Sequence, residues 1–350
     1  MTALWWTRAA MLLLGTAGLA APAAAQVQAR TDAGAPTTLV RRIDQLGAAF
    51  PGRVGIAVQS VDYGWRTGWK ETELYAQQSV SKVFVALAAM DAVDRGRLTL
   101  TGPVTLTRGD LTLFHQPIAQ RVLAGGTYTT TVEALMVQAL TKSDNTANDK
   151  LMRVTGGPTA VRRFIAERGL GAIRFYEGER ALQSRIAGLT WSQSYSIGDA
   201  FYKARDALPM TVRKSLFDRY VEDPYDGAAP TAIVSTLSRL KRVELLSPGS
   251  TARLLTIMSN TQTGKNRLRG GLKPGWTLAH KTGTGQILGG VQAGYNDIGV
   301  LTAPDGRSYA VAVLIKRTAA PLGLRMELMN DVVRSVIAAH EAGRGTLALQ

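Results

Sequence analysis

The sequence predicts an α/β fold of the α+β kind, in which a helical lobe is inserted into a lobe of strands and helices that both chain ends build together. Two observations predict it. Between about residues 78 and 258, nearly every periodic segment has helical spacing. Short β-branched or alternating segments, which are typical of strands, occur near the two ends of the 350-residue chain, at 54–61, 64–69, 276–279, 292–300 and 308–315.

Helices are expected near both ends of the chain and at the start of its middle part. Leu39, Ile43 and Leu46 recur at helical spacing and predict a first helix. The run 83–93 is apolar on nearly all sides, which is typical of a fully buried helix. A last helix is expected over about 324–342, with Gly343 as its stop. The whole is expected to be one domain, residues 26–350, with a sheet lobe at about 36–77 and 259–345 and a helical lobe at about 78–258.

The first 25 residues have the pattern of a secretory signal peptide. A short segment that contains Arg8 is followed by an apolar run at 9–21 and by small residues that end at Ala25. About a dozen apolar residues are fewer than the roughly 20 that a membrane-spanning helix needs. We therefore expect cleavage after Ala25, export to the periplasm or secretion, and no stable membrane anchor after cleavage.

Composition excludes several kinds of chemistry. The chain has no cysteine, which excludes disulfides, cysteine-bound zinc and thiol catalysis. Its three histidines have no metal-binding spacing, so we expect neither a metal nor another cofactor. The net charge of +15 is dispersed along the chain, which favours a role in solubility over a nucleic-acid partner or an anionic envelope surface.

Ser79 and Lys82 form an S-x-x-K motif at the start of the predicted buried helix. Three residues apart, they lie on one helical face, so the lysine amine could share the proton of the serine hydroxyl. Backbone N–H groups at the helix start could stabilise negative charge. A second copy, Ser238 to Lys241, lies in an amphipathic segment where Ser238 is expected on the solvated surface. The motif alone does not show whether either serine is a nucleophile.

Two further motifs carry polar groups. Ser143-Asp144-Asn145 could point a hydroxyl and a carboxamide into one cleft, although the same residue types are also typical helix N-caps. The segment that starts at Lys281 and Thr282 offers a cation and hydroxyls to a carboxylate, and its glycines would let a substrate approach the strand edge. The alternative for this segment is an ordinary strand end.

The three motifs occur in the order S-x-x-K, SDN, KTG, and in this order the chain resembles the class A serine β-lactamases and related penicillin-recognising enzymes. The second S-x-x-K copy follows SDN and does not fit. The likeness extends through SDNTAND, RLRGGLKPGW, HKTGTG and YNDIGVL. It implies a β-lactamase/transpeptidase-like fold, with an antiparallel sheet, flanking helices, an all-helical lobe and the active site between the lobes. It also implies a small-molecule β-lactam as substrate, and we expect a monomer.

The resemblance assigns a role to each motif residue. Ser79 would be the acylated nucleophile, Lys82 a proton acceptor and Ser143 a proton shuttle toward the lactam nitrogen. Backbone N–H groups of Ser79 and Thr284 would form the oxyanion hole. The expected substrate-binding residues are Asn145 for the acylamino group, and Lys281, Thr282, Gly283 and Thr284 for the carboxylate.

Three more positions follow from their place in the chain. Arg267 lies where some class A members supply a carboxylate-binding arginine, and a surface role is the alternative. Phe114 or His115 is expected at the cleft entrance.

Glu179 is the expected base for deacylation. It lies 36 residues after Ser143, the spacing of the family's loop glutamate, and Gln183 keeps a carboxamide that could help to hold a water. Two departures concern this loop: Glu177 replaces a bracing arginine, and 184–224 is longer than the family pattern. They leave open a D,D-peptidase of the same fold, an acylated sensor without turnover, and a surface salt bridge for Glu179.

Overall fold

The computed structural model describes Met1 and residues 34–348. The predicted leader, apart from Met1, therefore lies outside the described residues. Among the helices that are described, none combines the length and hydropathy that a membrane crossing requires.

One antiparallel sheet is built from both ends of the described chain. Its strands, in spatial order, are β2 (Arg66–Trp69), β1 (Arg53–Ser60), β10 (Ser308–Thr318), β9 (Val291–Thr302) and β7 (Thr277–Thr284), and β8 (Ile287–Leu288) pairs with β9. All five predicted strands are present. The prediction for β7 ended too early, because the strand continues through Lys281 to Thr284.

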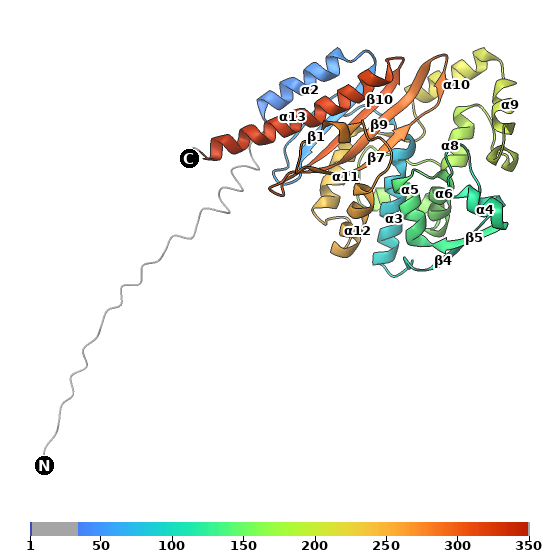
Figure 1. Ribbon diagram of the computed structural model, residues 1–350, viewed down its shortest axis with the longest axis horizontal. Helices are drawn as coiled ribbons and strands as arrows, with labels where there is room; N and C mark the ends of the chain where they lie inside the picture. The colour runs from blue at the N-terminus through green and yellow to red at the C-terminus, as the bar shows by residue number, and fades with distance from the viewer. Residues whose placement is uncertain (2–33, 349–350) are drawn as a thin grey trace.

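The alternation of side chains along β10 explains how the sheet is covered on both faces. Val311, Val313 and Ile315 pack on one side, in the same apolar cluster as helices α2 (Thr37–Ala49) and α13 (Leu322–Ala348). Ala310, Ala312 and Leu314 pack on the other side with α3 (Lys82–Asp94) and α11 (Pro230–Lys241). Figure 1 shows α2 and α13 together on one face of the sheet.

The predicted stop of the last helix is wrong. α13 continues through Gly343 to Ala348. Gly343 does not adopt the positive φ that a glycine stop requires. A glycine inside a helix costs only about 1 kcal/mol relative to alanine, which is too little to end a long helix by itself.

The middle of the chain is mostly helical and packs around α3, whose residues are buried from Lys82 to Ala92, as predicted. Besides α3 and α11, the α-helices of this part are α4 (Ala119–Gly125), α5 (Val132–Thr141), α6 (Asn145–Val154), α7 (Gly157–Glu167), α8 (Glu179–Ile186), α9 (Ala200–Asp206), α10 (Met210–Glu222) and α12 (Pro248–Ser259). Two short strand pairs were not predicted, namely β4 (Pro103–Thr107) with β5 (Thr127–Thr131), and β3 (Tyr75–Ala76) with β6 (Gly227–Ala228).

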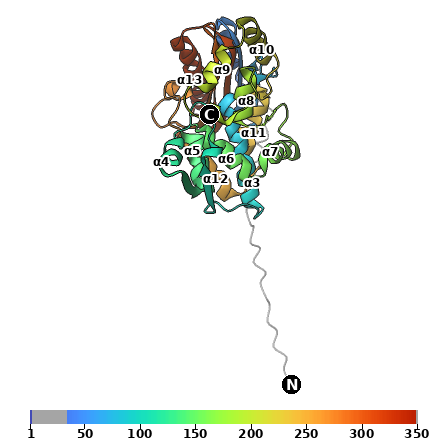
Figure 2. The ribbon, with the colours of Figure 1, turned by 90° about the vertical axis from the view of Figure 1, so that its right-hand side faces the viewer.

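The long segment 184–224 folds as the end of α8, followed by α9 and α10. Phe217 and Val221 of α10 pack with Leu182 of α8 in one small apolar cluster. Phe201 of α9 packs with Leu113 in another. Figure 2 shows the three helices on the side that faces the viewer.

Ser238 is not on the solvated surface, and that expectation is wrong. It is fully buried, and its hydroxyl accepts a hydrogen bond from Arg242 Nη1 (2.8 Å). The reason is that α11 packs against the sheet and α12, so residues on several of its sides are covered.

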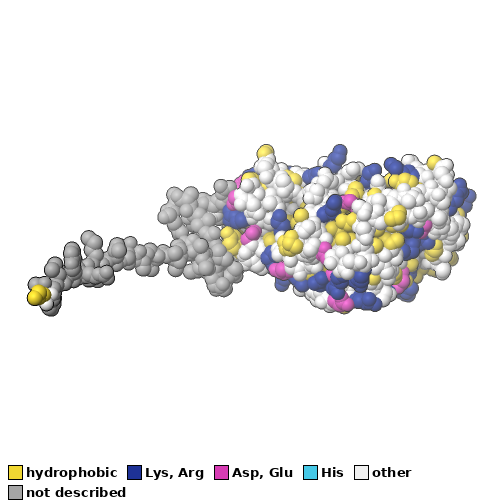
Figure 3. All heavy atoms as spheres, turned by 90° about the horizontal axis from the view of Figure 1, so that it is seen from below, with side chains coloured by type: hydrophobic (Ala, Val, Ile, Leu, Met, Phe, Trp, Pro, Cys, Tyr) yellow, Lys and Arg dark blue, Asp and Glu magenta, His cyan; other side chains and the backbone are white. Residues whose placement is uncertain are grey.

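Basic side chains are spread over the molecule. On the face in Figure 3, Lys and Arg side chains occur along the whole body, among acidic and hydrophobic ones. Several are paired with carboxylates, as in the contacts of Arg334 with Glu327 and Asp331.

Candidate active site

Ser79 lies in a 3₁₀ helix, Gln78–Ser81, directly before α3 begins at Lys82. The preceding residue, Gln78, has a φ of +53°, a left-handed conformation that is uncommon for a residue with a side chain. The two motif side chains meet as predicted, because Lys82 Nζ donates a hydrogen bond to Ser79 Oγ over 2.7 Å.

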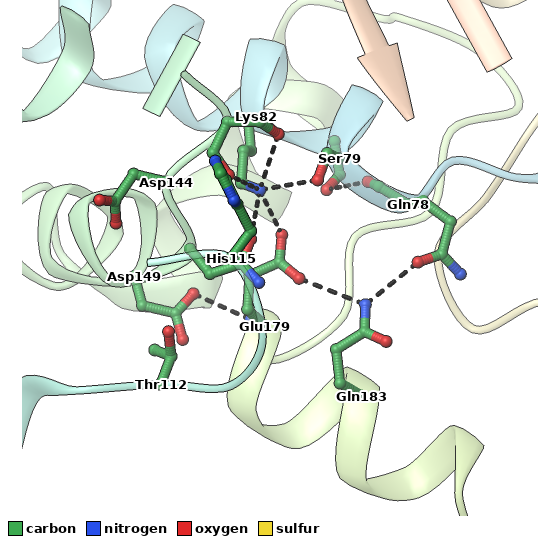
Figure 4. A network of polar contacts seen from close by, with 12 residues as sticks. Gln78, Ser79, Lys82, Thr112, His115, Asp144, Asp149, Glu179 and Gln183 are labelled. Carbon is green, nitrogen blue, oxygen red and sulfur yellow. Dashed lines mark hydrogen bonds and ion pairs between the residues drawn. The ribbon is translucent and has the colours of Figure 1, made fainter. Parts of the chain in front are cut away.

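The amine of Lys82 lies at the centre of a cluster of oxygen atoms. It is fully buried and contacts Asn145 Oδ1 at 2.6 Å and Glu179 Oε1 at 2.9 Å. It also lies 3.2 Å from the Ser143 carbonyl oxygen and 3.4 Å from Ser143 Oγ. Figure 4 shows the amine of Lys82 between Ser79 and Glu179. Together with its contacts to Ser143 and Asn145, one amine joins Ser79, the SDN motif and the Glu179 carboxylate.

The SDN motif places polar groups in the cavity and also caps a helix, which are the two interpretations that its residues allowed. Asp144 is the N-cap of α6, and its Oδ1 accepts from the Ala147 N–H at 2.9 Å. Ser143 has a φ of +60°, which turns the chain into the helix. Asn145 Nδ2 donates to the Leu113 carbonyl at 2.9 Å, which fixes the carboxamide with its oxygen toward Lys82.

Lys281 of β7 lies on the other side of Ser143. Its Nζ donates to Ser143 Oγ at 2.9 Å and to the Thr282 carbonyl at 2.8 Å. Its side chain is completely buried. Burial and then the charge of Lys82 lower the pKa of Lys281 well below its ordinary value.

Thr282 and Thr284 line the site cavity, whereas Gly283 between them packs against backbone. Thr282 Oγ1 lies 2.7 Å from Thr263 Oγ1, and both Thr282 and Thr284 line the active-site cavity. Gly283 does not line it. A Cβ atom on Gly283 would lie 2.4 Å from the Gln77 carbonyl oxygen, so the missing side chain lets β7 pack against the helix that carries Ser79.

Arg267 is part of the site wall, and the alternative of a surface role is wrong. Its Nη1 donates to the carbonyl oxygens of Gly283 (3.0 Å) and Asn296 (2.7 Å), and its Nη2 donates to Thr284 Oγ1 (2.6 Å). The guanidinium lies 3.8 Å from the centre of the Tyr295 ring. Its hydrogen-bonding capacity is largely used in holding the end of β7.

Glu179 is buried at the first turn of α8, so the alternative of a surface salt bridge is wrong. The backbone N–H groups of Glu179 and Arg180 donate to Asp149 of α6, over 2.9 and 3.3 Å. Asp149 therefore caps α8 from outside. Burial and then the charge of Glu179 raise the pKa of Asp149 to about 6. Glu177, in the place of the bracing arginine, pairs with Arg162 of α7 at 3.2 Å.

A chain of amide and hydroxyl groups runs from Glu179 into the long segment. Gln183 Nε2 donates to Glu179 Oε2 (3.3 Å) and Gln78 Oε1 (3.1 Å). Gln78 Nε2 donates to the hydroxyl of Tyr220 (2.6 Å), which donates to Asp226 Oδ1 (2.8 Å). Asp226 also accepts from the Gln78 N–H (2.7 Å), and burial raises its pKa to about 6.

These groups surround a cavity of about 690 Å³. Phe114 and His115 line it, as expected for the entrance. The predicted site residues in its wall are Ser79, Ser143, Asn145, Glu179, Gln183, Arg267, Thr282 and Thr284. Lys82 and Lys281 lie behind this wall. Within the part of the chain that the structure describes, no three histidine, aspartate or glutamate side chains gather into a group that could hold a metal ion.

Comparison with known proteins decides the family. A family profile described as the β-lactamase enzyme family matches residues 38–339. The chain belongs to this β-lactamase family. Two of its relatives are the β-lactamase VEB-1 of Pseudomonas aeruginosa, 25% identical over 85% of this chain and 88% of the relative, and the extended-spectrum β-lactamase PER-1 of the same organism, 28% identical over 80% of each.

Solved structures agree with this β-lactamase fold. A β-lactamase from Chitinophaga pinensis is 25% identical, with a TM-score of 0.72 over 87% of this chain and 100% of the other. An ancestral class A β-lactamase is 26% identical, with a TM-score of 0.67 over 86% and 99%. The predicted fold class and the predicted resemblance to class A serine β-lactamases are confirmed.

Several residues in or beside this cavity carry no motif and were missed. Tyr220 and Asp226 lie in or near the long segment, and their link to Gln78 is a tertiary contact that no spacing reveals. The same holds for Tyr202 and Arg205 of α9, which line the active-site cavity. Asp149 lies four residues after Asn145, on the same face of α6, but no helix was predicted there.

Proposed function

We propose that the chain hydrolyses the amide bond of β-lactams through an acyl-enzyme on Ser79. One observation carries this proposal. The buried Lys82 amine lies within hydrogen-bonding distance of Ser79 Oγ and Glu179 Oε1, at 2.7 and 2.9 Å, so it links a nucleophile to a candidate base for water. The names of the relatives, which are β-lactamases, support the substrate class.

In acylation, Lys82 first passes a proton to Glu179 Oε1, which lies 2.9 Å away. Ser79 Oγ then attacks the carbonyl carbon of the lactam, and its proton passes to the neutral amine of Lys82. The backbone N–H groups of Ser79 and Thr284 would stabilise the oxyanion. The lactam C–N bond then breaks, and the nitrogen takes a proton from the Ser143 hydroxyl. Lys82, whose Nζ lies 3.4 Å from Ser143 Oγ, returns a proton to Ser143. The lactam nitrogen thus gains one proton, Ser79 carries an ester, and Glu179 returns its proton to Lys82 before deacylation.

Substrate binding is assigned to the rest of the cavity wall. Thr282 and Thr284 would hold the substrate carboxylate, with Lys281 and Arg267 as the cations behind them. Asn145 would bind the acylamino group.

In deacylation, Glu179 takes a proton from a water molecule, whose oxygen attacks the ester carbonyl. The bond to Ser79 Oγ breaks, and Ser79 regains its proton through Lys82, which contacts both groups. Gln183 supports this step, since its Nε2 donates to Glu179 Oε2 and its Oε1 accepts from Gln286 Nε2 at 3.0 Å. The product is the ring-opened acid.

Export to the periplasm, a monomeric state and the absence of a nucleic-acid partner stay predictions. We propose that the enzyme acts outside the cytoplasm, which the leader pattern at 1–25 supports.

Hydrolysis of benzylpenicillin by the purified mature chain tests the proposal. Wild type should open the lactam ring catalytically, and Ser79→Ala should abolish turnover. Cleavage of a D-Ala-D-Ala peptide in place of benzylpenicillin would make the chain a peptidase. Turnover that survives in Ser79→Ala would move the nucleophile elsewhere.

A further inference from the structure

We propose that the cavity contains a second anion subsite, formed by Arg205 with Tyr202 and Phe114. It would take a β-lactam whose acyl side chain carries both an aromatic group and a second negative charge. The inference rests on the proposed function and names its substrate class.

The subsite comes from the long segment between Gln183 and α11. Tyr202 and Arg205 lie on α9 and line the same cavity as Ser79 and Glu179. Arg205 also borders a smaller hollow with Ile186 of α8 and Ile287 of β8. Arg205 is therefore beside α8 and β8, whereas Arg267 is held against Gly283 and Asn296 of the sheet.

The guanidinium of Arg205 keeps donors available for a ligand. Its Nε donates to Asp206 Oδ1 at 3.0 Å, and its centre lies 5.2 Å from the Tyr202 ring centre. Among the described residues, its two terminal nitrogens have no hydrogen-bonding partner. The two terminal nitrogens of Arg267, in contrast, both donate to the protein itself. Arginine presents a planar fork of donors that fits a carboxylate or a sulfonate.

Asp206, the carboxylate that pairs with Arg205, does not fully neutralise the positive charge there. Asp206 is shared, because it also pairs with Arg213 at 3.1 Å. Two guanidinium groups thus face one carboxylate, which leaves an excess of positive charge around Arg205. The side chain of Arg205 is 24% exposed, so screening by solvent is reduced but not removed.

Aromatic surface lies next to this charge. Phe114 and Tyr202 are 39% and 45% exposed, and their ring centres are 6.2 Å apart. Phe201, buried beneath them, meets Phe114 edge to face at 5.1 Å and so fixes its position. A ligand ring could cover these apolar surfaces while its anionic substituent reaches Arg205.

A matched pair of substrates tests the subsite. Carbenicillin differs from benzylpenicillin by one carboxylate on the side chain beside the phenyl ring. We expect Arg205→Gln to lower kcat/KM for carbenicillin by about tenfold through KM, the effect of losing one charge-assisted hydrogen bond. Its kcat/KM for benzylpenicillin should stay within about twofold, and Arg205→Lys should keep part of the preference.

Lys203→Gln is the matched control. It removes one positive charge from the same helix, but Lys203 is 75% exposed and pairs with Asp199 outside the cavity. It should leave the ratio of kcat/KM for the two substrates unchanged. The Arg205→Gln effect should also shrink as salt concentration rises.

Three outcomes separate the possibilities. Equal losses on both substrates in Arg205→Gln, or no loss on either, would overturn the subsite while benzylpenicillin hydrolysis keeps the proposed function. Failure of wild type to open benzylpenicillin would instead overturn the proposed function, and the subsite with it. A selective loss on carbenicillin alone supports both.

Discussion

At the scale of single residues, Lys82 has more oxygen neighbours than it has donors. Oxygens of Ser79, Ser143, Asn145 and Glu179 all lie within 3.4 Å of its amine. An ammonium offers three N–H groups, so these contacts must be shared. The amine can therefore change partners with little movement, which is what the proposed proton transfers among Ser79, Ser143 and Glu179 require. Removal of one of these side chains should therefore slow either acylation or deacylation more than the other step.

Glu179→Gln tests the separation of steps. The change keeps the shape of the side chain and removes the base for water, so acylation should persist while deacylation slows by about 10²–10⁴-fold. Stopped-flow absorbance with benzylpenicillin would measure a burst followed by slow turnover. Glu177→Gln is the control, since its half-exposed carboxylate lies two residues earlier and pairs with Arg162. Turnover of Glu179→Gln within twofold of wild type would remove Glu179 from the mechanism.

At the scale of elements, α8 is positioned by groups from outside itself. Asp149 of α6 accepts hydrogen bonds from the first N–H groups of α8, and the Gln78–Tyr220 contact joins the 3₁₀ helix that carries Ser79 to α10. Phe217 and Val221 of α10 add apolar packing against Leu182. The orientation of Glu179 therefore depends on α6 and α10 as well as on its own helix.

Tyr220→Phe tests the contribution of α10. The variant loses the hydroxyl between Gln78 Nε2 and Asp226 Oδ1, which leaves two buried polar atoms without that partner. We expect a cost of about 1–3 kcal/mol in the free energy of unfolding, and a several-fold slower deacylation with acylation unchanged. Tyr225→Phe is the control, since that ring lies 5.9 Å from the Tyr220 ring. A stability loss with unchanged deacylation would make Tyr220 purely structural.

The cap of α8 predicts a pH dependence. The pKa of Asp149 is about 6 in the folded chain and near 3.9 when unfolded, so the folded state binds more protons between these values. The contribution of Asp149 to the free energy of unfolding is therefore largest below about pH 4. It falls by roughly 2–3 kcal/mol as the pH rises through 6. Urea unfolding at pH 4 and pH 7 should show wild type losing that much relative to Asp149→Asn. A constant difference between the two proteins would contradict the assignment.

At the scale of the whole molecule, the site lies where segments far apart in the sequence meet. Ser79 and Lys82 come from the helical middle, Lys281 and Thr282 from the edge strand β7, and Glu179 from α8. One apolar cluster continues across this junction, since it contains Ile298 and Ala312 of the sheet together with helical residues such as Leu135 and Leu151. The two parts therefore share a core.

A shared core predicts cooperative unfolding. Urea transitions followed by far-ultraviolet circular dichroism and by tryptophan fluorescence should coincide, because neither part can lose its packing alone. Trp65, Trp69 and Trp276 report on the sheet side and Trp191 reports on the helical side, whereas most of the circular dichroism signal comes from helices in the middle of the chain. Two separated transitions would contradict this prediction.

Periodicity and motifs predicted the main strands, the buried helix and several residues of the candidate site. Short β-branched or alternating segments predicted β1, β9 and β10, and the unbroken apolar run predicted α3, because each of these patterns lies within a few consecutive residues. The order of three motifs brought together Ser79, Ser143 and Lys281. The pattern could not reveal Tyr220, Asp226 or Arg205, since their roles depend on where α9 and α10 pack. The predicted helix end at Gly343 was wrong because the cost of one glycine is small compared with the stability of a long helix.

The most direct test of the account is intact-mass spectrometry of the mature chain over time after addition of benzylpenicillin, with hydrolysed drug measured in the same tube. The account predicts one adduct on the peptide that contains Ser79, which forms first and disappears as product accumulates. An adduct that persists while no product forms would contradict hydrolysis and indicate a penicillin-binding peptidase or sensor. The absence of any adduct together with the absence of product would contradict acylation itself.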